Sequence, residues 1–156
     1  MISSPVHPLL SELDEYEKSY YRHHQTMNSW SILQLYRHLI DKSNEFLDFA
    51  EQCEFAPPLA TKGRTRFGNL VFLYGEVPWV RIRFRDDLDI ELENNLDYAI
   101  LKESARQLVT RIDQVKTHAQ TIDSSRKIYQ EELGWLNVSD WLEWLDIHLQ
   151  YHLRKR

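Results

Sequence analysis

The sequence predicts a mainly α-helical protein in which long helices flank one irregular segment. Two observations support this fold class. Helix-breaking residues are few, four glycines and five prolines in 156 residues, and most of them lie between Pro57 and Pro78. On either side of that segment, apolar side chains recur at the three- to four-residue spacing of an amphipathic helix. Four stretches show this spacing: residues 8–25, 31–53, 94–119 and 136–152.

Composition restricts the functional class. A chain of 156 residues is most simply one domain, residues 1–156. Its net charge of −5 argues against a nucleic-acid-binding protein, which usually carries a basic face. No apolar run approaches the roughly 18 residues of a membrane span, and the N-terminus lacks the pattern of a signal peptide, so a cytoplasmic protein is expected. Cys53 is the only cysteine, which excludes an internal disulfide and favours a small buried side chain.

The first predicted helix runs from Pro8 to about Gln25. Leucines and tyrosines at helical spacing form its apolar face, and acidic side chains lie on the other face. His23 and His24 fall at the end of this helix, where solvated side chains are expected.

The second predicted helix begins at a capping signal. Ser31 and Gln34 have the spacing of a capping box, and the helix is expected to continue to about residue 53. His38 lies two turns into it, with Asp41 and Glu45 on the same side. A lone histidine within a helix is usually structural, so His38 gains interest only if other histidines approach it. The predicted core face of this helix holds Ile32, Leu35, Leu39, Phe46, Phe49 and Ala50.

The middle of the chain, residues 54–93, gives a mixed signal. The apolar stretch Phe67–Tyr74 is short, and its periodicity fits either a strand or a helix. Val80–Arg85 and Leu88–Glu93 both alternate strictly between apolar and charged residues, which predicts a β-hairpin. Its register would set arginines opposite acidic residues on one face. These arginines fit either an anion site or a solvated charged face.

The third predicted helix is capped by Asn94 or Asn95 and runs to about Ala119. His118, near its C-terminus, is well placed for the helix dipole, which is a sufficient structural reason for it. A loop through Gly134 then leads to the last helix. The predicted apolar face of the third helix holds Leu96, Ile100, Leu101, Ala105, Leu108, Val109, Ile112 and Val115.

The last helix carries the strongest functional signal. Asn137 is a good N-cap, and Asp140 places a negative charge near the helix N-terminus, where the dipole favours it. Residues three and four apart share a helix face. One stripe of this helix therefore holds Trp141, Trp144, His148 and His152.

Two histidines four residues apart present their rings side by side, as a pair of metal ligands requires. The simpler interpretation is a surface pair, or two core histidines that are hydrogen-bonded to neighbours. Here the pair continues a stripe of tryptophans, so it is expected to face inward. Helical bundles build metal sites from inward side chains on facing helices. His38 is therefore a candidate third ligand beside His148 and His152.

With its histidines in this order, the chain resembles the DinB/YfiT-like family of metal-dependent proteins. The resemblance covers nearly the full length and rests on the order and spacing of three motifs. They are Trp30-Ser31-Ile32-Leu33-Gln34 before His38, Phe67-Gly68-Asn69-Leu70, and Leu133-Gly134-Trp135-Leu136 with Asp140-Trp141 before His148-x-x-x-His152. The middle motif resembles a short helix that some members carry, which implies a helix at Phe67–Tyr74.

The resemblance implies a four-helix up-down bundle with an irregular or β-hairpin insert between the second and third helices. It implies a divalent metal ion, such as zinc, nickel or iron, held by His38, His148 and His152 with water in the open positions. Some members transfer low-molecular-weight thiols or isomerise small acids. This chain departs from one branch of the family, in which a histidine often stands where it has Tyr151 and a glutamine where it has Lys155, so no specific substrate carries over.

The predicted function is that of a metal-dependent hydrolase or thiol transferase acting on a small molecule, with a thiol as a candidate cofactor. Asp41 and Glu45 are candidates for a base, a fourth ligand or partners of the histidines, and Trp141 and Trp144 for an apolar pocket wall. No nucleic-acid or membrane partner is expected, and a homodimer is left open. The alternative is a non-catalytic bundle that holds a structural metal or none.

Overall fold

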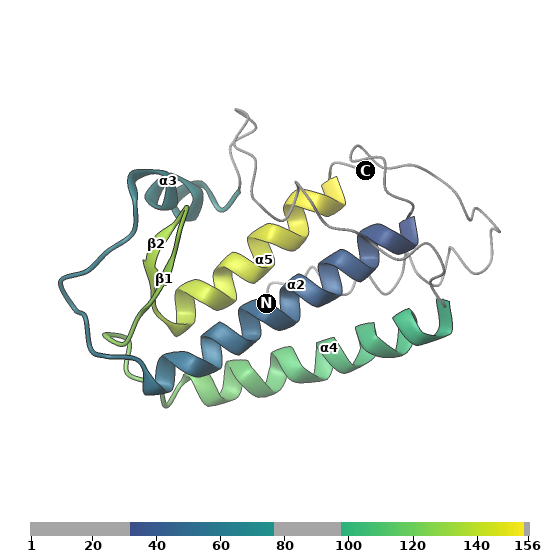
Figure 1. Cartoon of the computed structure of the whole chain (residues 1–156), viewed down its shortest axis with the longest axis horizontal. Coiled ribbons are helices and arrows are strands. Elements are labelled where there is room, and N and C mark those ends of the chain that lie inside the picture. Colours follow the sequence, from purple (N-terminus) through teal and green to yellow (C-terminus); the bar gives the residue numbers. More distant parts are fainter. Residues whose placement is uncertain (1–31, 77–97, 155–156) are drawn as a thin grey trace.

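The computed structural model describes residues 32–76 and 98–154, and most of them are helical (Figure 1). The first predicted helix and the predicted hairpin at residues 80–93 lie outside the described residues. None of the described helices is long and apolar enough to cross a membrane. The elements in chain order are α2 (Ile32–Gln52), the 3-10 turn η1 (Cys53–Phe55), α3 (Arg66–Tyr74), α4 (Tyr98–Ala119), β1 (Ile128–Gln130), β2 (Gly134–Leu136) and α5 (Val138–Arg154).

The long helices α2, α4 and α5 lie side by side, and α2 packs against both of the others (Figure 1). Phe49 near the end of α2 stacks on Trp141 near the start of α5, so these two helices run antiparallel. Arg111 bonds to Asp48, and His118 to Glu54 further along both helices, so α2 and α4 run parallel. The alternating up-down order that was predicted is therefore wrong for α2 and α4, because these ion pairs align the two helices in the same direction.

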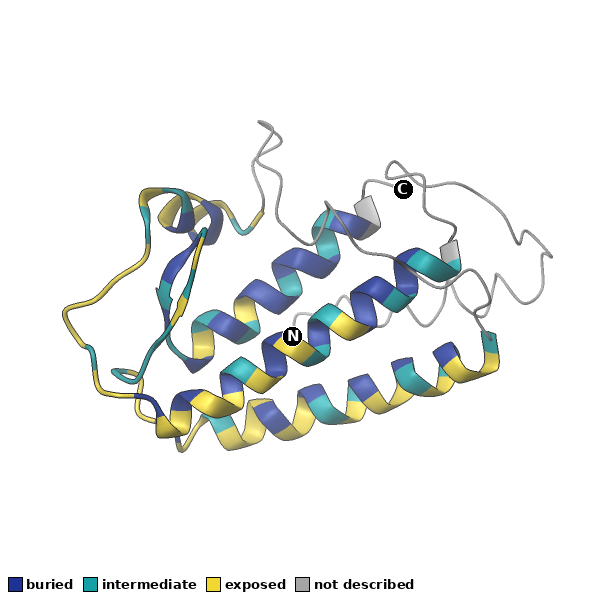
Figure 2. Ribbon diagram, viewed as in Figure 1, coloured by how far each residue is buried: buried dark blue, intermediate teal, exposed yellow. Residues whose placement is uncertain are grey.

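The second predicted helix is confirmed, and it contributes more side chains to the core than the sequence suggested. Of its predicted core face, Leu35, Leu39, Phe46 and Ala50 are buried, and Phe49 is half-buried. Tyr36, Ile40 and Leu47 are buried as well. One apolar stripe was predicted, but a helix with a neighbour on each side buries more than one stripe (Figure 2).

The third predicted helix ends at Ala119, as expected, and its described part begins at Tyr98. Ile100 was predicted to face the core, but it is 59% exposed. Its neighbour Leu101 is buried, and two consecutive residues lie about 100° apart around a helix, so only one of them faces α2. The buried residues of this helix are Leu101, Ala105, Leu108, Ile112 and Val115.

The stretch Phe67–Tyr74 lies within helix α3, so the strand alternative is wrong and the helix implied by the resemblance is confirmed. Thr65 caps its start, because its side-chain oxygen accepts a hydrogen bond from the backbone N–H of Gly68. Gly75 ends it in the left-handed conformation, with φ of 67°, which favours glycine.

A small antiparallel β-hairpin stands where a loop was predicted before the last helix. In it β1 pairs with β2, with Ile128 opposite Leu136 and Gln130 opposite Gly134. Strands of three residues are too short to show an alternating pattern, so the sequence carried little signal for them. Gly134 has φ of 93°, and a Cβ atom there would lie 2.6 Å from the backbone nitrogen of Thr65.

The hairpin is tied to the start of α3. The backbone N–H of Thr65 donates to the carbonyl of Leu133, and the hydroxyl of Thr65 donates to the carbonyl of Glu132. At Gly68 a Cβ atom would lie 2.3 Å from the Leu133 carbonyl oxygen, so only glycine permits this approach. These contacts join the connection after α2 to the strand that leads into α5.

Candidate metal centre

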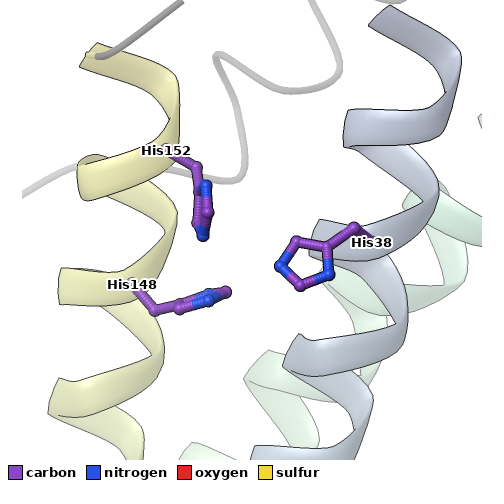
Figure 3. Close-up of side chains that lie close together, drawn as sticks. All are labelled: His38, His148 and His152. Carbon is purple, nitrogen blue, oxygen red and sulfur yellow. The ribbon is translucent and has the colours of Figure 1, made fainter. Parts of the chain in front are cut away.

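Three histidines from two helices gather between α2 and α5 (Figure 3). His38 comes from the second turn of α2, and His148 and His152 come from consecutive turns of α5. The side chains are turned toward one another, as Figure 3 shows, and the residues are 1%, 1% and 5% exposed. The sequence prediction that these positions converge inside the protein is confirmed.

The rings are close enough to share one ion. The ring centroid of His38 lies 5.7 Å from that of His148 and 5.1 Å from that of His152. The ring centroids of His148 and His152 are 4.6 Å apart. One ring nitrogen from each residue lies within 4.8 Å of the other two. Nitrogens about 2.1 Å from a tetrahedral ion are roughly 3.4 Å apart, so small side-chain rotations bring this group to metal-binding distance.

The start of α5 fixes the direction in which its histidines point. The Asn137 side chain accepts a hydrogen bond from the backbone N–H of Asp140 at 2.9 Å, and the Asp140 carboxylate accepts one from the backbone N–H of Asn137 at 3.1 Å. This reciprocal pair is a capping box, and it holds the first turn in register. The predicted N-cap is therefore confirmed, and His148 and His152 follow on the same face.

Aromatic rings cover the site on the side of the α5 N-terminus. Phe46 of α2 packs edge-on against His148, with ring centroids 5.2 Å apart, and Trp144 lies 5.8 Å from the same ring. Trp141 is also buried and packs against Phe46 and Phe49. Trp144 thus borders the histidines, whereas Trp141 lies one layer further away.

Phe46 is a residue that sequence reasoning placed in the core but not at this site. Its distance of eight residues from His38 was a usable signal, because positions i and i+8 both belong to the same apolar stripe of a helix. Only the position of α5 shows that Phe46 contacts a histidine. Tyr151, which departs from the family pattern, packs edge-on against His152 with ring centroids 5.1 Å apart.

The two candidate carboxylates lie on the exposed side of α2. Asp41 pairs with Arg37 at 3.0 Å, and Glu45 pairs with Lys42 at 3.0 Å. Among the described residues, neither carboxylate belongs to the group of ligand atoms that the three histidines form. Their roles as a base or as partners of the histidines stay predictions.

Asp146 is a partly buried carboxyl group that the sequence did not single out. Burial raises its pKa above the ordinary value, and the charge of Lys116 acts in the opposite direction. It lies two residues before His148, which places it on a different face of α5 from the two histidines. Asp146 therefore faces away from the stripe that the histidines share.

Three neutral imidazoles in a buried site are a donor set that suits zinc, nickel or iron. They would leave a bound divalent ion its full charge and at least one open position, which is the pattern of catalytic sites. The chain was compared with protein-family models, curated proteins and solved structures, and it matches none of them. The described architecture is that of a mainly helical protein with a buried three-histidine group that could hold a metal ion.

Proposed function

We propose that this protein is a metal-dependent enzyme of the DinB/YfiT type that acts on a small molecule. The observation that supports the proposal is the convergence of His38, His148 and His152, with a ring nitrogen of each within 4.8 Å of the others. Three imidazoles that converge in this way offer one nitrogen each to a common point, which is the donor arrangement of a divalent metal site. A shared divalent ion gives the cluster a physical reason.

A divalent ion held by three imidazoles lowers the pKa of a water molecule or thiol in its open position, which produces a nucleophile near neutral pH. The proposed reaction classes are therefore hydrolysis and the transfer of a low-molecular-weight thiol. Phe46 and Trp144 would exclude bulk water from one side of the site, because both rings pack against His148. Excluding water from the site strengthens the electrostatic interactions with the reacting groups.

Metal binding is the first test. Protein purified without chelators is analysed for metal content, and the stripped protein is titrated with zinc, nickel and ferrous ions while its thermal unfolding is followed. Metal at one hundred times its Kd stabilises the folded state by about 2.7 kcal/mol. His38→Ala and His152→Ala are expected to abolish that stabilisation. His118→Ala is the matched control, because His118 is exposed and pairs with Glu54.

The open coordination position is tested with cobalt(II) in place of the native metal. In a site with an exchangeable position, the visible spectrum of cobalt changes when a small thiol is added. A closed structural site gives no such change. An absence of metal binding, or identical titrations of His152→Ala and the unaltered protein, would exclude the enzyme proposal.

A further inference from the structure

A cavity of about 240 Å³ lies between α2, α5 and the β-hairpin. Its lining includes Phe46 and Trp144, which also pack against His148, but none of the three histidines. These two rings therefore form a wall between the cavity and the candidate metal centre. The cavity is smaller than the roughly 300–1,000 Å³ of pockets for drug-sized ligands, so it suits a compact molecule.

Aromatic side chains from all three elements form the walls of this cavity. They are Phe46, Phe49, Tyr129, Trp141 and Trp144. Phe49 stacks on Trp141 with ring centroids 4.8 Å apart, and the Phe46 centroid lies 6.2 Å from that of Trp141 and 5.9 Å from that of Trp144. Aromatic rings favour offset-stacked and edge-to-face partners at such distances. A further planar ring in the cavity would find partners of both kinds.

The charged groups that line the cavity already have partners. Lys42 pairs with Glu45 at 3.0 Å. The Glu132 carboxylate accepts a hydrogen bond from the side-chain amide of Gln130, and Glu131 also takes part in an interaction. A cation would have to compete with these partners, and an anion would meet three carboxylates against one ammonium group. The lining therefore favours a neutral molecule.

Trp141 carries an unused hydrogen-bond donor. The residue is 1% exposed, and among the described residues its indole N–H has no acceptor. Most buried indole N–H groups find a partner, because a donor that is left unpaired away from water destabilises the folded state. Since Trp141 lines the cavity, a small rotation of its ring would bring the N–H within reach of an acceptor atom on a molecule bound there.

We propose that this cavity binds a compact, neutral aromatic molecule that carries a carbonyl oxygen or a similar acceptor. The ring of the ligand packs among the five aromatic walls, and its oxygen accepts a hydrogen bond from the indole N–H of Trp141. Burial of the planar apolar surface supplies most of the affinity, and the hydrogen bond fixes the orientation. The ligand matches both features of the site, because it brings the missing acceptor and no charge.

Four probes separate the contributions of ring, acceptor and charge: acetophenone, α-methylstyrene, benzoate and benzylammonium. α-Methylstyrene has the shape of acetophenone, with a methylene group in place of the carbonyl oxygen. Binding to the full chain is followed by the indole N–H resonances in nitrogen-15 NMR spectra. Acetophenone is expected to shift the Trp141 resonance saturably and to bind up to about tenfold more tightly than α-methylstyrene, which is the gain from one hydrogen bond. Both charged probes are expected to bind more weakly than acetophenone.

Trp141→Phe tests the donor directly. This variant assigns the Trp141 resonance and keeps an aromatic wall while it removes the N–H. It is expected to bind acetophenone and α-methylstyrene with equal affinity, as read from the Trp144 resonance. A preference for acetophenone that survives in Trp141→Phe would show that the acceptor is bound elsewhere and would contradict the proposal.

Tyr129 offers a test of the walls at a position that tolerates change, because it is 53% exposed. Tyr129→Ala removes one wall and is expected to weaken acetophenone binding several-fold. Tyr129→Phe keeps the ring and should bind as the unaltered protein does. Tyr74→Ala is the matched control, because Tyr74 is also exposed and does not line the cavity.

The proposal does not depend on the metal centre, and the experiment separates the two. Acetophenone binding is measured on metal-stripped and on metal-loaded protein, and equal affinity is expected. Loss of metal binding in His152→Ala with unchanged acetophenone affinity would support two independent sites. The proposal is overturned by equal affinity for acetophenone and α-methylstyrene, by tighter binding of benzylammonium, by the absence of a saturable shift, or by binding that requires the metal.

Discussion

The face of α2 that meets α5 and the face that meets α4 differ in chemistry. Toward α5, α2 presents His38, Phe46 and Phe49, which contact imidazole and indole rings. Toward α4, a groove of about 900 Å³ is lined mainly by charged and polar side chains of both helices. The side of α2 that meets α5 is thus buried and aromatic and includes histidine rings. The side that meets α4 is more polar and carries ion pairs.

Arg111 shows how the α4 side uses its charges. Its guanidinium donates to the Asn44 side chain at 2.9 Å, to Glu51 at 2.8 Å and to Asp48, and it also bonds to the Asn44 carbonyl. These polar groups serve to align two parallel helices. The buried polar groups on the α5 side instead gather at one point, as a ligand site requires. The candidate metal centre therefore lies on the side of α2 that meets α5, and the polar groups on the side that meets α4 align the two helices.

The largest expected effect is on the α5 side. Phe46→Ala should lower the free energy of unfolding by about 3–5 kcal/mol, because it removes a buried ring from between two tryptophans and a histidine. Denaturant unfolding at constant pH measures the loss. Phe46→Leu, which retains most of the apolar volume, should lose much less. Equal losses for the two variants would mean that ring contacts, rather than buried volume, hold this side together.

The α4 side should respond less. Arg111→Ala is expected to lower the free energy of unfolding by about 1–2 kcal/mol, because hydrogen bonds between charged groups are lost at a partly exposed site. The loss should shrink in high salt, which screens exposed ion pairs. Metal affinity should stay unchanged. A weaker metal affinity in Arg111→Ala would break the division of roles between the two sides.

The start of α5 gives a smaller effect. Asn137→Ala should lower the free energy of unfolding by about 1 kcal/mol, because it removes the acceptor for the Asp140 N–H in the capping box. Thermal or denaturant unfolding measures the change, and Ser139→Ala, at an exposed position of the first turn, is the control. If the first turn of α5 frays without its cap and the histidines shift as a result, metal affinity will fall in Asn137→Ala but not in Ser139→Ala.

Much of this site could be predicted from the sequence, because it is carried by helices with strong local signals. Spacing alone put His148 and His152 on one face of α5, and Asn137 marked where that face begins. The convergence of His38 with this pair depended on which helices are neighbours, and the order of motifs supplied that information. The structure bears out the inward convergence of all three residues.

Other features could not be read from local patterns. The parallel course of α2 and α4 depends on how the chain returns between them, which no helical periodicity encodes. The hairpin before α5 is made of three-residue strands and is held by contacts of Thr65 and Gly68 with distant residues. Ile100 is exposed and the next residue, Leu101, is buried, because consecutive residues point about 100° apart around a helix. Which of the two faces α2 depends on how α4 is rotated about its own axis, and the sequence does not fix that rotation.

The smallest expected effect concerns two consecutive residues just after the end of α2, one of which faces α4 and the other the start of α5. Glu54 pairs with His118 of α4 in an exposed position, whereas Cys53 is fully buried, with its Sγ 3.8 Å from the carbonyl of Leu136. Burial, together with the charge of Asp140, raises the pKa of the Cys53 thiol to about 11 from the ordinary value of 9.0. The thiol form is therefore favoured in the folded protein.

At pH 8 the folded protein should react with iodoacetamide at least about 100-fold more slowly than the urea-unfolded chain, because two pKa units reduce the thiolate fraction by that factor. The sign of the effect on stability follows from linkage. The unfolded chain loses the proton first, so this contribution is fully present below pH 9 and is lost as the pH rises through 11. Fast labelling of the folded protein would show that water reaches the α5 side of α2 at this end, and the contrast between its two faces would then hold only near the histidines.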